Sequence, residues 1–249
     1  NTNETPWRPP GDGTAAGLNR YPEPRPLTLT ASLAAHYGVD PRQILVTRGS
    51  SEAIDVVIRA FCRAGQDEIV ICPPTFGMYE TYAQIQGAGI RRIPLLRDQG
   101  YALDTAAILA QWTPATRVVF VCSPNNPTGN SFPAAQVAAL ARALDGRGVV
   151  VLDAAYAEFA TTDPSGELLA RHDNVVVLRT LSKAMGLAGV RCGALLARAE
   201  IVALLGCVLP PYTFPTVCAE AVQRCLEPAM AGAWQERVAR LRRERDRLA

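Results

Sequence analysis

Short apolar runs rich in β-branched residues recur along this chain, and helical stretches separate most of them. Several of the runs are apolar at almost every position, as a strand requires when both faces of its sheet are covered. This alternation predicts an α/β fold with a mostly parallel sheet between helices. The apolar runs lie at residues 44–46, 69–72, 89–93, 118–122, 149–152, 175–178 and 192–196. The helical stretches include residues 51–62, 76–86, 104–111, 133–144, 216–226 and 232–248.

The composition excludes several classes of protein. The 249 residues are 49% hydrophobic and 19% charged, which is too apolar for a disordered chain. No apolar run approaches the roughly 20 residues of a membrane span, and a net charge of +2 is too small to indicate a nucleic-acid partner. Seven scattered cysteines without a CxxC pair, together with two isolated histidines, argue against a metal site. We therefore expect a cytoplasmic protein with reduced thiols that contacts neither membrane nor nucleic acid.

Proline and glycine are concentrated at the beginning of the chain. Residues 1–31 carry prolines at positions 6, 9, 10, 22, 24 and 26, which predicts an extended N-terminal arm. From residue 32 the pattern becomes regular and continues without an internal repeat or a low-complexity linker, so one large domain is expected up to about residue 230.

Polar side chains follow three of the predicted strands. Asn126 lies in a loop rich in proline and asparagine after the run at 118–122, Asp153 follows the run at 149–152, and Lys183 closely follows the run at 175–178. Ligands of an open α/β sheet bind beyond the carboxyl ends of its strands, so an amide, a carboxylate and an amine are expected at one edge. Lys183 is the only lysine beside 24 arginines, and lysine can lose its proton and act as a nucleophile whereas arginine cannot.

These three side chains suit pyridoxal phosphate. The amine can form a Schiff base with the cofactor, and the carboxylate can keep the ring nitrogen protonated. The phosphate needs backbone N–H groups at a helix start together with a cation, which residues 49–51, Ser182 and Arg191 can supply.

Each of these residues also has a simpler interpretation when it is taken singly. Asp153 can cap a turn, Lys183 can be a surface charge, and residues 124–129 can form only a tight turn. Residues 49–51 can be an ordinary helix N-cap, and Tyr79 and Tyr156 can be packing residues. Their joint order and spacing favours the cofactor site.

Five segments resemble the pyridoxal-phosphate-dependent aminotransferases of fold type I, and more closely the histidinol-phosphate aminotransferase branch. Asn-Asn-Pro-Thr-Gly and the Ser-Lys segment are general to the superfamily, whereas Tyr-Pro-Glu-Pro and Cys-Pro-Pro-Thr-Phe-Gly-Met-Tyr are more particular to this branch. The resemblance covers essentially the whole chain. It implies a three-layer α/β/α fold in which residues 32–230 form the large cofactor-binding domain. The segments that carry it are residues 20–24, 47–54, 72–79, 123–129 and 179–193.

The resemblance implies a role for each matching residue. Lys183 is expected to form the Schiff base and later to move a proton between substrate and cofactor, while Asp153 pairs with the ring nitrogen. Tyr21 is expected to reach the cofactor phosphate of a partner subunit, which implies a homodimer. The implied reaction moves an amino group between L-histidinol phosphate and 2-oxoglutarate. The other expected contacts are Asn126 and Tyr156 to the ring oxygen, Tyr79 on the ring face, and Ser50, Ser51, Ser182 and Arg191 to the phosphate.

The chain departs from the family pattern in two places. The family usually has Asp-Glu-Ala-Tyr where this sequence has Asp-Ala-Ala-Tyr at 153–156, although the missing glutamate is not the partner of the ring nitrogen. Family members also continue into a small C-terminal domain that supplies a substrate-binding arginine. We expect that domain to be largely absent here and residues 231–249 to begin the helix that leads to it.

Two kinds of alternative remain open at this point. One is another fold type I enzyme with the same cofactor, such as an aromatic aminotransferase or a threonine-phosphate decarboxylase. The other is a non-catalytic domain that binds pyridoxal phosphate.

Overall fold

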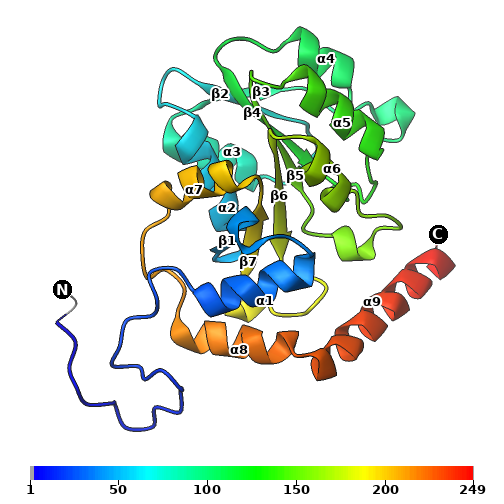
Figure 1. The fold of residues 1–249 in the computed structure, drawn as a ribbon. Coiled ribbons are helices and arrows are strands. Elements are labelled where there is room, and N and C mark those ends of the chain that lie inside the picture. The colour runs from blue at the N-terminus through cyan, green and yellow to red at the C-terminus, as the bar shows by residue number, and fades with distance from the viewer. Residues whose placement is uncertain (1–2, 249) are drawn as a thin grey trace.

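A seven-stranded sheet runs through the centre of the molecule (Figure 1). The computed structural model describes residues 3–248, apart from the side chain of residue 231. The strands lie in the order β1-β7-β6-β5-β4-β2-β3 and match the predicted apolar runs to within two residues. Their bounds are β1 (Ile44–Thr47), β2 (Glu68–Ile71), β3 (Gly89–Arg92), β4 (Thr116–Cys122), β5 (Val149–Asp153), β6 (Val175–Thr180) and β7 (Gly193–Leu196).

Most neighbouring strands are parallel, as the sequence predicts. β2 pairs in parallel with β3 and β4, and the parallel pairs β4–β5 and β5–β6 continue the sheet. β7 runs the other way and is antiparallel to both β6 and β1. The register pairs Cys122 with Asp153 and Asp153 with Leu178, so the carboxyl ends of β4, β5 and β6 meet at one edge.

Helices cover both faces of the sheet and complete the three predicted layers (Figure 1). Val118 and Phe120 of β4 share a core with α2, α3 and α7, whereas Val119 and Val121 share one with α1, α4, α5, α6 and α8. Successive residues of β4 thus contact opposite layers, which explains why almost every position is apolar. The bounds are α1 (Leu27–Tyr37), α2 (Gly49–Phe61), α3 (Met78–Gln86), α4 (Thr105–Ala110), α5 (Ala134–Ala143), α6 (Ser165–Arg171), α7 (Ala199–Val208) and α8 (Thr216–Leu226).

The N-terminal segment has neither helix nor strand from residue 3 to residue 26. Local contacts hold its loops. The Asp12 carboxylate, for example, accepts hydrogen bonds from the backbone N–H groups of Thr14 and Leu18 at 2.9 and 2.7 Å. Arg25 attaches the segment to the end of α7, because its guanidinium donates to the carbonyls of Gly206 and Leu209, both at 2.6 Å. α1 begins five residues before the expected boundary at residue 32, and residues 1 and 2 of the predicted arm lie outside the described residues.

The last helix, α9 (Pro228–Leu248), leads away from the three layers (Figure 1). It begins four residues before the predicted stretch at 232–248, because proline is well tolerated in the first turn of a helix. Val238 is buried, and Arg245 donates to the carbonyl of Phe159 at 3.0 Å, which ties the helix to the short 3₁₀ turn η3 (Ala157–Phe159). Residue 249 of the predicted segment 231–249 lies outside the described residues.

Three further predictions from the sequence concern membrane spans, metal ligands and cysteines. Within residues 3–248, no helix combines the length and the hydrophobicity needed to cross a bilayer. The same residues contain no group of three potential metal ligands. All seven cysteines are unpaired, and four of them are buried, namely Cys62, Cys72, Cys122 and Cys192.

Candidate active site

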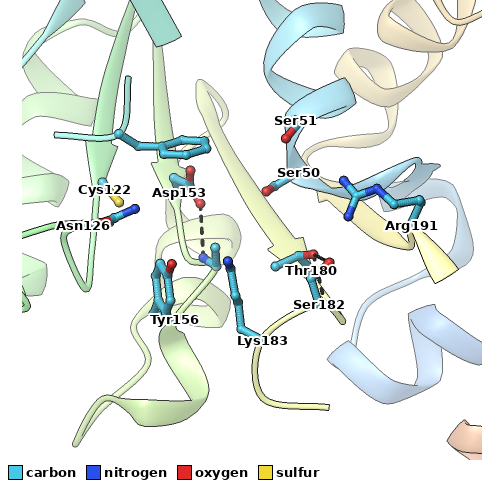
Figure 2. Close-up of a pocket in the computed structure, with 12 residues that line it drawn as sticks. Ser50, Ser51, Cys122, Asn126, Asp153, Tyr156, Thr180, Ser182, Lys183 and Arg191 are labelled. Carbon is cyan, nitrogen blue, oxygen red and sulfur yellow. Dashed lines mark hydrogen bonds between the residues drawn. The ribbon is translucent and has the colours of Figure 1, made fainter. Parts of the chain in front are cut away.

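A cavity opens where the carboxyl ends of β4, β5 and β6 face the first turn of α2 (Figure 2). It encloses about 540 Å³ of space, which includes the open solvent at its mouth. The structure brings eight of the ten predicted site residues together in its lining, while Tyr79 and Tyr21 are not part of it. The lining residues are Ser50, Ser51, Phe76, Cys122, Asn126, Asp153, Ala155, Tyr156, Thr180, Ser182, Lys183 and Arg191.

Asp153 is the last residue of β5 and lies deep in this cavity, with only 2% of its surface exposed. Its Oδ2 accepts a hydrogen bond from the Tyr79 hydroxyl at 2.7 Å, and its Oδ1 accepts one from the backbone N–H of Ala155 at 3.1 Å. Burial raises the pKa of Asp153, although these two hydrogen bonds and the positive charge of Lys183 act in the opposite direction. The site therefore contains a carboxylate whose ionised form calls for a cationic partner.

Lys183 follows the end of β6 and points into the cavity beside Tyr156 (Figure 2). Its Nζ lies 5.3 Å from the centroid of the Tyr156 ring, within the range of a cation–π contact. The backbone around it is fixed, because Leu181 donates to the carbonyl of Cys192 at 3.0 Å and Gly186 donates to the carbonyl of Lys183 at 3.1 Å. The only lysine of the chain is thus held at the same sheet edge as Asp153.

The two asparagines in the loop after β4 have different roles. Asn125 is buried, and its side-chain amide donates to the carbonyl of Pro74 at 2.9 Å and to the hydroxyl of Thr128 at 2.6 Å. Its Oδ1 accepts a hydrogen bond from Thr75 at 3.1 Å. Asn125 therefore fixes the loop, and Asn126 is left to present its amide to the cavity.

The opposite end of the cavity is the first turn of α2, which lies directly on β7. A Cβ at Gly193 would lie 2.6 Å from the carbonyl carbon of Gly49, closer than real structures allow. Gly49 has φ +78°, and a Cβ there would lie 2.8 Å from Nη2 of Arg191. Two glycines thus bring the helix start, the sheet and the Arg191 guanidinium together.

This end of the cavity is suited to an anion. The first N–H groups of a helix have no partner within the helix, and the helix dipole makes that end positive. Ser50 and Ser51 occupy this turn, and Ser182 lies across from them. The Thr180 hydroxyl donates to Ser182 Oγ at 3.0 Å and accepts from the Ser182 backbone N–H at 3.2 Å, which orients Ser182.

The structure departs from the expectation for Tyr79. The residue is fully buried, and its ring is stacked on Phe120 with 4.6 Å between the centroids. Phe76 lines the cavity instead and meets Tyr79 edge to face at 5.7 Å. The reason is that α3 begins at Met78 and not at residue 76, so Phe76 lies in the preceding loop while Tyr79 and Ala83 face the core. Phe76, and not Tyr79, is therefore the aromatic side chain that lines the cavity.

Tyr21 lies outside the cavity of its own chain. It is 57% exposed on the N-terminal segment, and its ring packs against Tyr212 with 5.2 Å between the centroids. The Tyr21 backbone N–H donates to a carboxylate oxygen of Glu4 at 2.8 Å. An exposed tyrosine held in this way is free to contact another molecule.

Sequence reasoning missed four of the residues that line the cavity. Thr180 is the last residue of β6 and Cys122 the last of β4, so the rule that ligands bind at strand ends points to both of them. Ala155 follows Asp153 by two residues. Phe76 carries no comparable signal, because its position depends on where the next helix begins.

A family model described as aminotransferase class I and II matches residues 11–249. The chain therefore belongs to the class I and II aminotransferases. Within this family, curated histidinol-phosphate aminotransferases resemble it over its whole length. Those of Stenotrophomonas maltophilia (strain R551-3) and Xanthomonas campestris pv. campestris (strain 8004) are each 44% identical over 250 residues, which is 100% of this chain and 68% and 69% of the relatives.

Solved structures show the same fold. The histidinol-phosphate aminotransferase from Sinorhizobium meliloti, in complex with pyridoxal-5'-phosphate, is 27% identical with a TM-score of 0.83 and matches 92% of this chain and 62% of its own. The N-succinyldiaminopimelate aminotransferase from Mycobacterium tuberculosis is 29% identical with a TM-score of 0.78 and matches 94% of this chain and 65% of its own. The chain thus spans less than two thirds of these solved relatives.

Proposed function

We propose that this protein is a pyridoxal-phosphate-dependent aminotransferase that moves an amino group between L-histidinol phosphate and 2-oxoglutarate. The observation that carries the proposal is the meeting of Lys183 and Asp153 in one cavity that also contains the start of α2. The donor substrate is taken from the relatives, which are histidinol-phosphate aminotransferases. The acceptor, 2-oxoglutarate, is taken from the family resemblance of the sequence.

The lining of the cavity fits this cofactor in charge and in shape. A phosphate suits the first turn of α2 with Arg191 beside it, because unpaired N–H groups and a guanidinium both attract anions. A protonated ring nitrogen suits the buried carboxylate of Asp153. Phe76 offers an apolar surface for a flat ring. In Figure 2, Lys183 lies between the Asp153 end and the Arg191 end.

When bound, pyridoxal phosphate supplies an aldehyde that takes up an amino group and a ring that withdraws electrons from the substrate carbon. Lys183 would bond the cofactor through Nζ and, once displaced by the amine of the substrate, carry a proton on the same nitrogen. General acid–base transfer of this kind contributes roughly 10²–10⁴-fold to a rate. Asp153 would hold the proton on the ring nitrogen.

The remaining lining residues would bind and orient the cofactor. Asn126 and Tyr156 would donate hydrogen bonds to the ring oxygen, and Phe76 would pack on the ring face. The phosphate would be held by the backbone N–H groups of α2 and by the side chains of Ser50, Ser51, Ser182 and Arg191.

The proposal extends to the assembly and to the domains. Tyr21 is exposed, and we propose that it reaches the cofactor phosphate of a second copy, so that two chains form a homodimer. Residues 32–230 would form the cofactor-binding domain and residues 231–249 would lead to a small C-terminal domain. Cytoplasmic location fits the unpaired cysteines, which stay reduced there.

Borohydride reduction of the protein with pyridoxal phosphate, followed by peptide mapping, tests the central assignment. Reduction makes the bond between the amine and the cofactor permanent, and we expect the label on the peptide that contains Lys183, since the sequence has no other lysine. The matched control is Lys183→Arg, which keeps the charge but loses the nucleophilic amine. It should take no label and lose at least about 10²-fold in turnover with histidinol phosphate.

Two kinds of outcome would count against the proposal. A label on another peptide, or normal turnover by Lys183→Arg, would refute the role of Lys183. Faster turnover of an aromatic amino acid, or release of carbon dioxide from threonine phosphate, would keep the cofactor assignment and replace the substrate.

A further inference from the structure

Tyr79 contacts the site from behind its lining. It lies in the first turn of α3, is 0% exposed, and has its ring between Phe120 and Phe76. Its hydroxyl donates to Oδ2 of Asp153 at 2.7 Å. A tyrosine held by two aromatic rings has little freedom to turn, so this donor stays aimed at the carboxylate.

Within the described residues, the groups that face Asp153 are neutral apart from one amine, and two of them, Tyr79 and Ala155, donate hydrogen bonds to it. Tyr79 approaches from α3, the backbone N–H of Ala155 from the loop after β5, and the Cys122 thiol from the end of β4, while Lys183 supplies the positive charge. Burial raises the pKa of Tyr79 well above its ordinary value and that of Cys122 to about 12. Both groups are therefore protonated at neutral pH, and Tyr79 acts as a donor to the carboxylate.

A neutral donor does something for Asp153 that a second cation in its place could not do. A hydrogen bond to the ionised form lowers the pKa of a carboxyl group and offsets part of the effect of burial. An arginine or lysine there would also neutralise the carboxylate and compete with the cofactor for it. A phenol stabilises the anion and leaves its charge available to the ring nitrogen.

We propose that Tyr79 is a positioning residue that keeps Asp153 ionised and oriented, so that the cofactor ring nitrogen keeps its proton. This inference rests on the proposed function, because it assigns Asp153 to that nitrogen. Tyr79 itself does not line the cavity and contacts the site through Asp153.

The test compares Tyr79→Phe with the wild type, both loaded with pyridoxal phosphate that carries ¹⁵N in the ring. Phenylalanine keeps the stacked ring and removes only the hydroxyl. Without that donor Asp153 becomes more basic, so the shared proton moves from the ring nitrogen toward the carboxylate. We expect the ¹⁵N signal to shift toward the unprotonated position at constant pH, and the cofactor to bind about tenfold more weakly.

Cofactor affinity measured over a pH series gives a second readout, because a change in packing alone would not shift the pH at which affinity falls. The cofactor binds more tightly to ionised Asp153 than to the neutral acid, so affinity should fall on the acid side of the profile. In Tyr79→Phe this fall should begin about one pH unit higher than in the wild type. The matched control is Tyr82→Phe, which removes a hydroxyl from the same helix. Within the described residues that hydroxyl makes no hydrogen bond to Asp153. The ¹⁵N signal and the pH at which affinity begins to fall should therefore both stay at wild-type values.

A double-mutant cycle separates the inference from a general effect on folding. In an Asp153→Asn background, Tyr79→Phe should change cofactor affinity less than twofold, because the carboxylate on which it acts is gone. An unchanged ¹⁵N signal and an unchanged acid limb in Tyr79→Phe would overturn the inference while leaving the proposed function intact. Failure of the wild type to form a reducible bond at Lys183 would instead overturn the proposed function, and the inference with it.

Discussion

At the scale of single residues, the site depends on a carboxylate placed where water hardly reaches it. Asp153 is almost completely buried, and burial raises its pKa from the ordinary value of 3.8. The folded chain therefore binds this proton more tightly than the unfolded chain, so folding stability falls as the pH rises from about 4 through the raised pKa. Without cofactor, an ionised Asp153 destabilises the fold that carries it.

Asp153→Asn should therefore separate stability from function. We expect the cofactor-free variant to unfold at a higher urea concentration than the wild type at neutral pH, because no carboxylate charge remains buried at position 153. Its free energy of unfolding should be larger by on the order of 1 kcal/mol. The difference should shrink as the pH falls toward 4. Pyridoxal phosphate should bind the variant about 10–100-fold more weakly, since a charge-assisted hydrogen bond is lost.

Urea titrations at several pH values, together with fluorescence titrations of the cofactor, measure both effects. A wild type that is as stable as Asp153→Asn at every pH would contradict this account of burial. Equal cofactor affinity in the two proteins would contradict the assignment of Asp153 to the ring nitrogen.

At the scale of the elements, the phosphate end of the site exists because α2 can lie directly on β7. The contact is closest at Gly193, where an added Cβ would come within 2.8 Å of the Arg179 carbonyl oxygen and still closer to Gly49. Backbone atoms surround that position, so no flexible side chain can move away to make room. The close approach of α2 to β7 thus requires a residue without a side chain at position 193.

Gly193→Ala should push the start of α2 away from β7. We expect a loss of about 1–3 kcal/mol in the free energy of unfolding, as for other overpacked sites, and weaker binding of the cofactor phosphate. Gly206→Ala is the matched control, because a Cβ at Gly206 on α7 has no neighbour within 4 Å. That variant should gain about 0.5–1 kcal/mol, since alanine favours a helix over glycine. Denaturant titration measures the free energy of unfolding of the two variants. Equal stability of Gly193→Ala and Gly206→Ala would argue against close contact at Gly193.

At the scale of the whole molecule, the N-terminal segment is tied to the body of the chain yet leaves an aromatic side chain exposed. Arg25 holds its end against the carbonyls at the end of α7, and Tyr21 packs on Tyr212 with much of its ring uncovered. This arrangement suits a segment that completes the site of a second copy, because symmetric dimers exchange identical contacts.

Mixed dimers test this arrangement directly. Tyr21→Ala should bind the cofactor about tenfold more weakly, and Lys183→Arg should be inactive. If Tyr21 acts across the interface, an equal mixture of the two variants contains dimers with one intact site. Such a mixture should regain about one quarter of wild-type turnover at limiting cofactor. Activity no higher than the mean of the two separate variants would place Tyr21 outside the partner's site.

Much of the fold can be predicted from the sequence, because the alternation of apolar runs and helical stretches determines the order of strands and helices. The buried strands β4, β5 and β6 are apolar at successive positions, and chain order alone brings Asn126, Asp153 and Lys183 to the edge where those strands end. The chemical types of these residues, above all a single lysine, then indicate the cofactor. These features depend on residue type and spacing, and both can be read from a linear chain.

Tertiary structure decided which aromatic residue meets the cavity and how closely the helix start approaches the sheet. Phe76 and Tyr79 lie three residues apart in one segment, and the starting point of α3 turns the first toward the cavity and the second toward Asp153. Likewise, no local pattern reveals that Gly193 and Gly49 touch, since they lie in separate elements. Contacts of this kind depend on how distant parts of the chain pack, which spacing along the sequence does not encode.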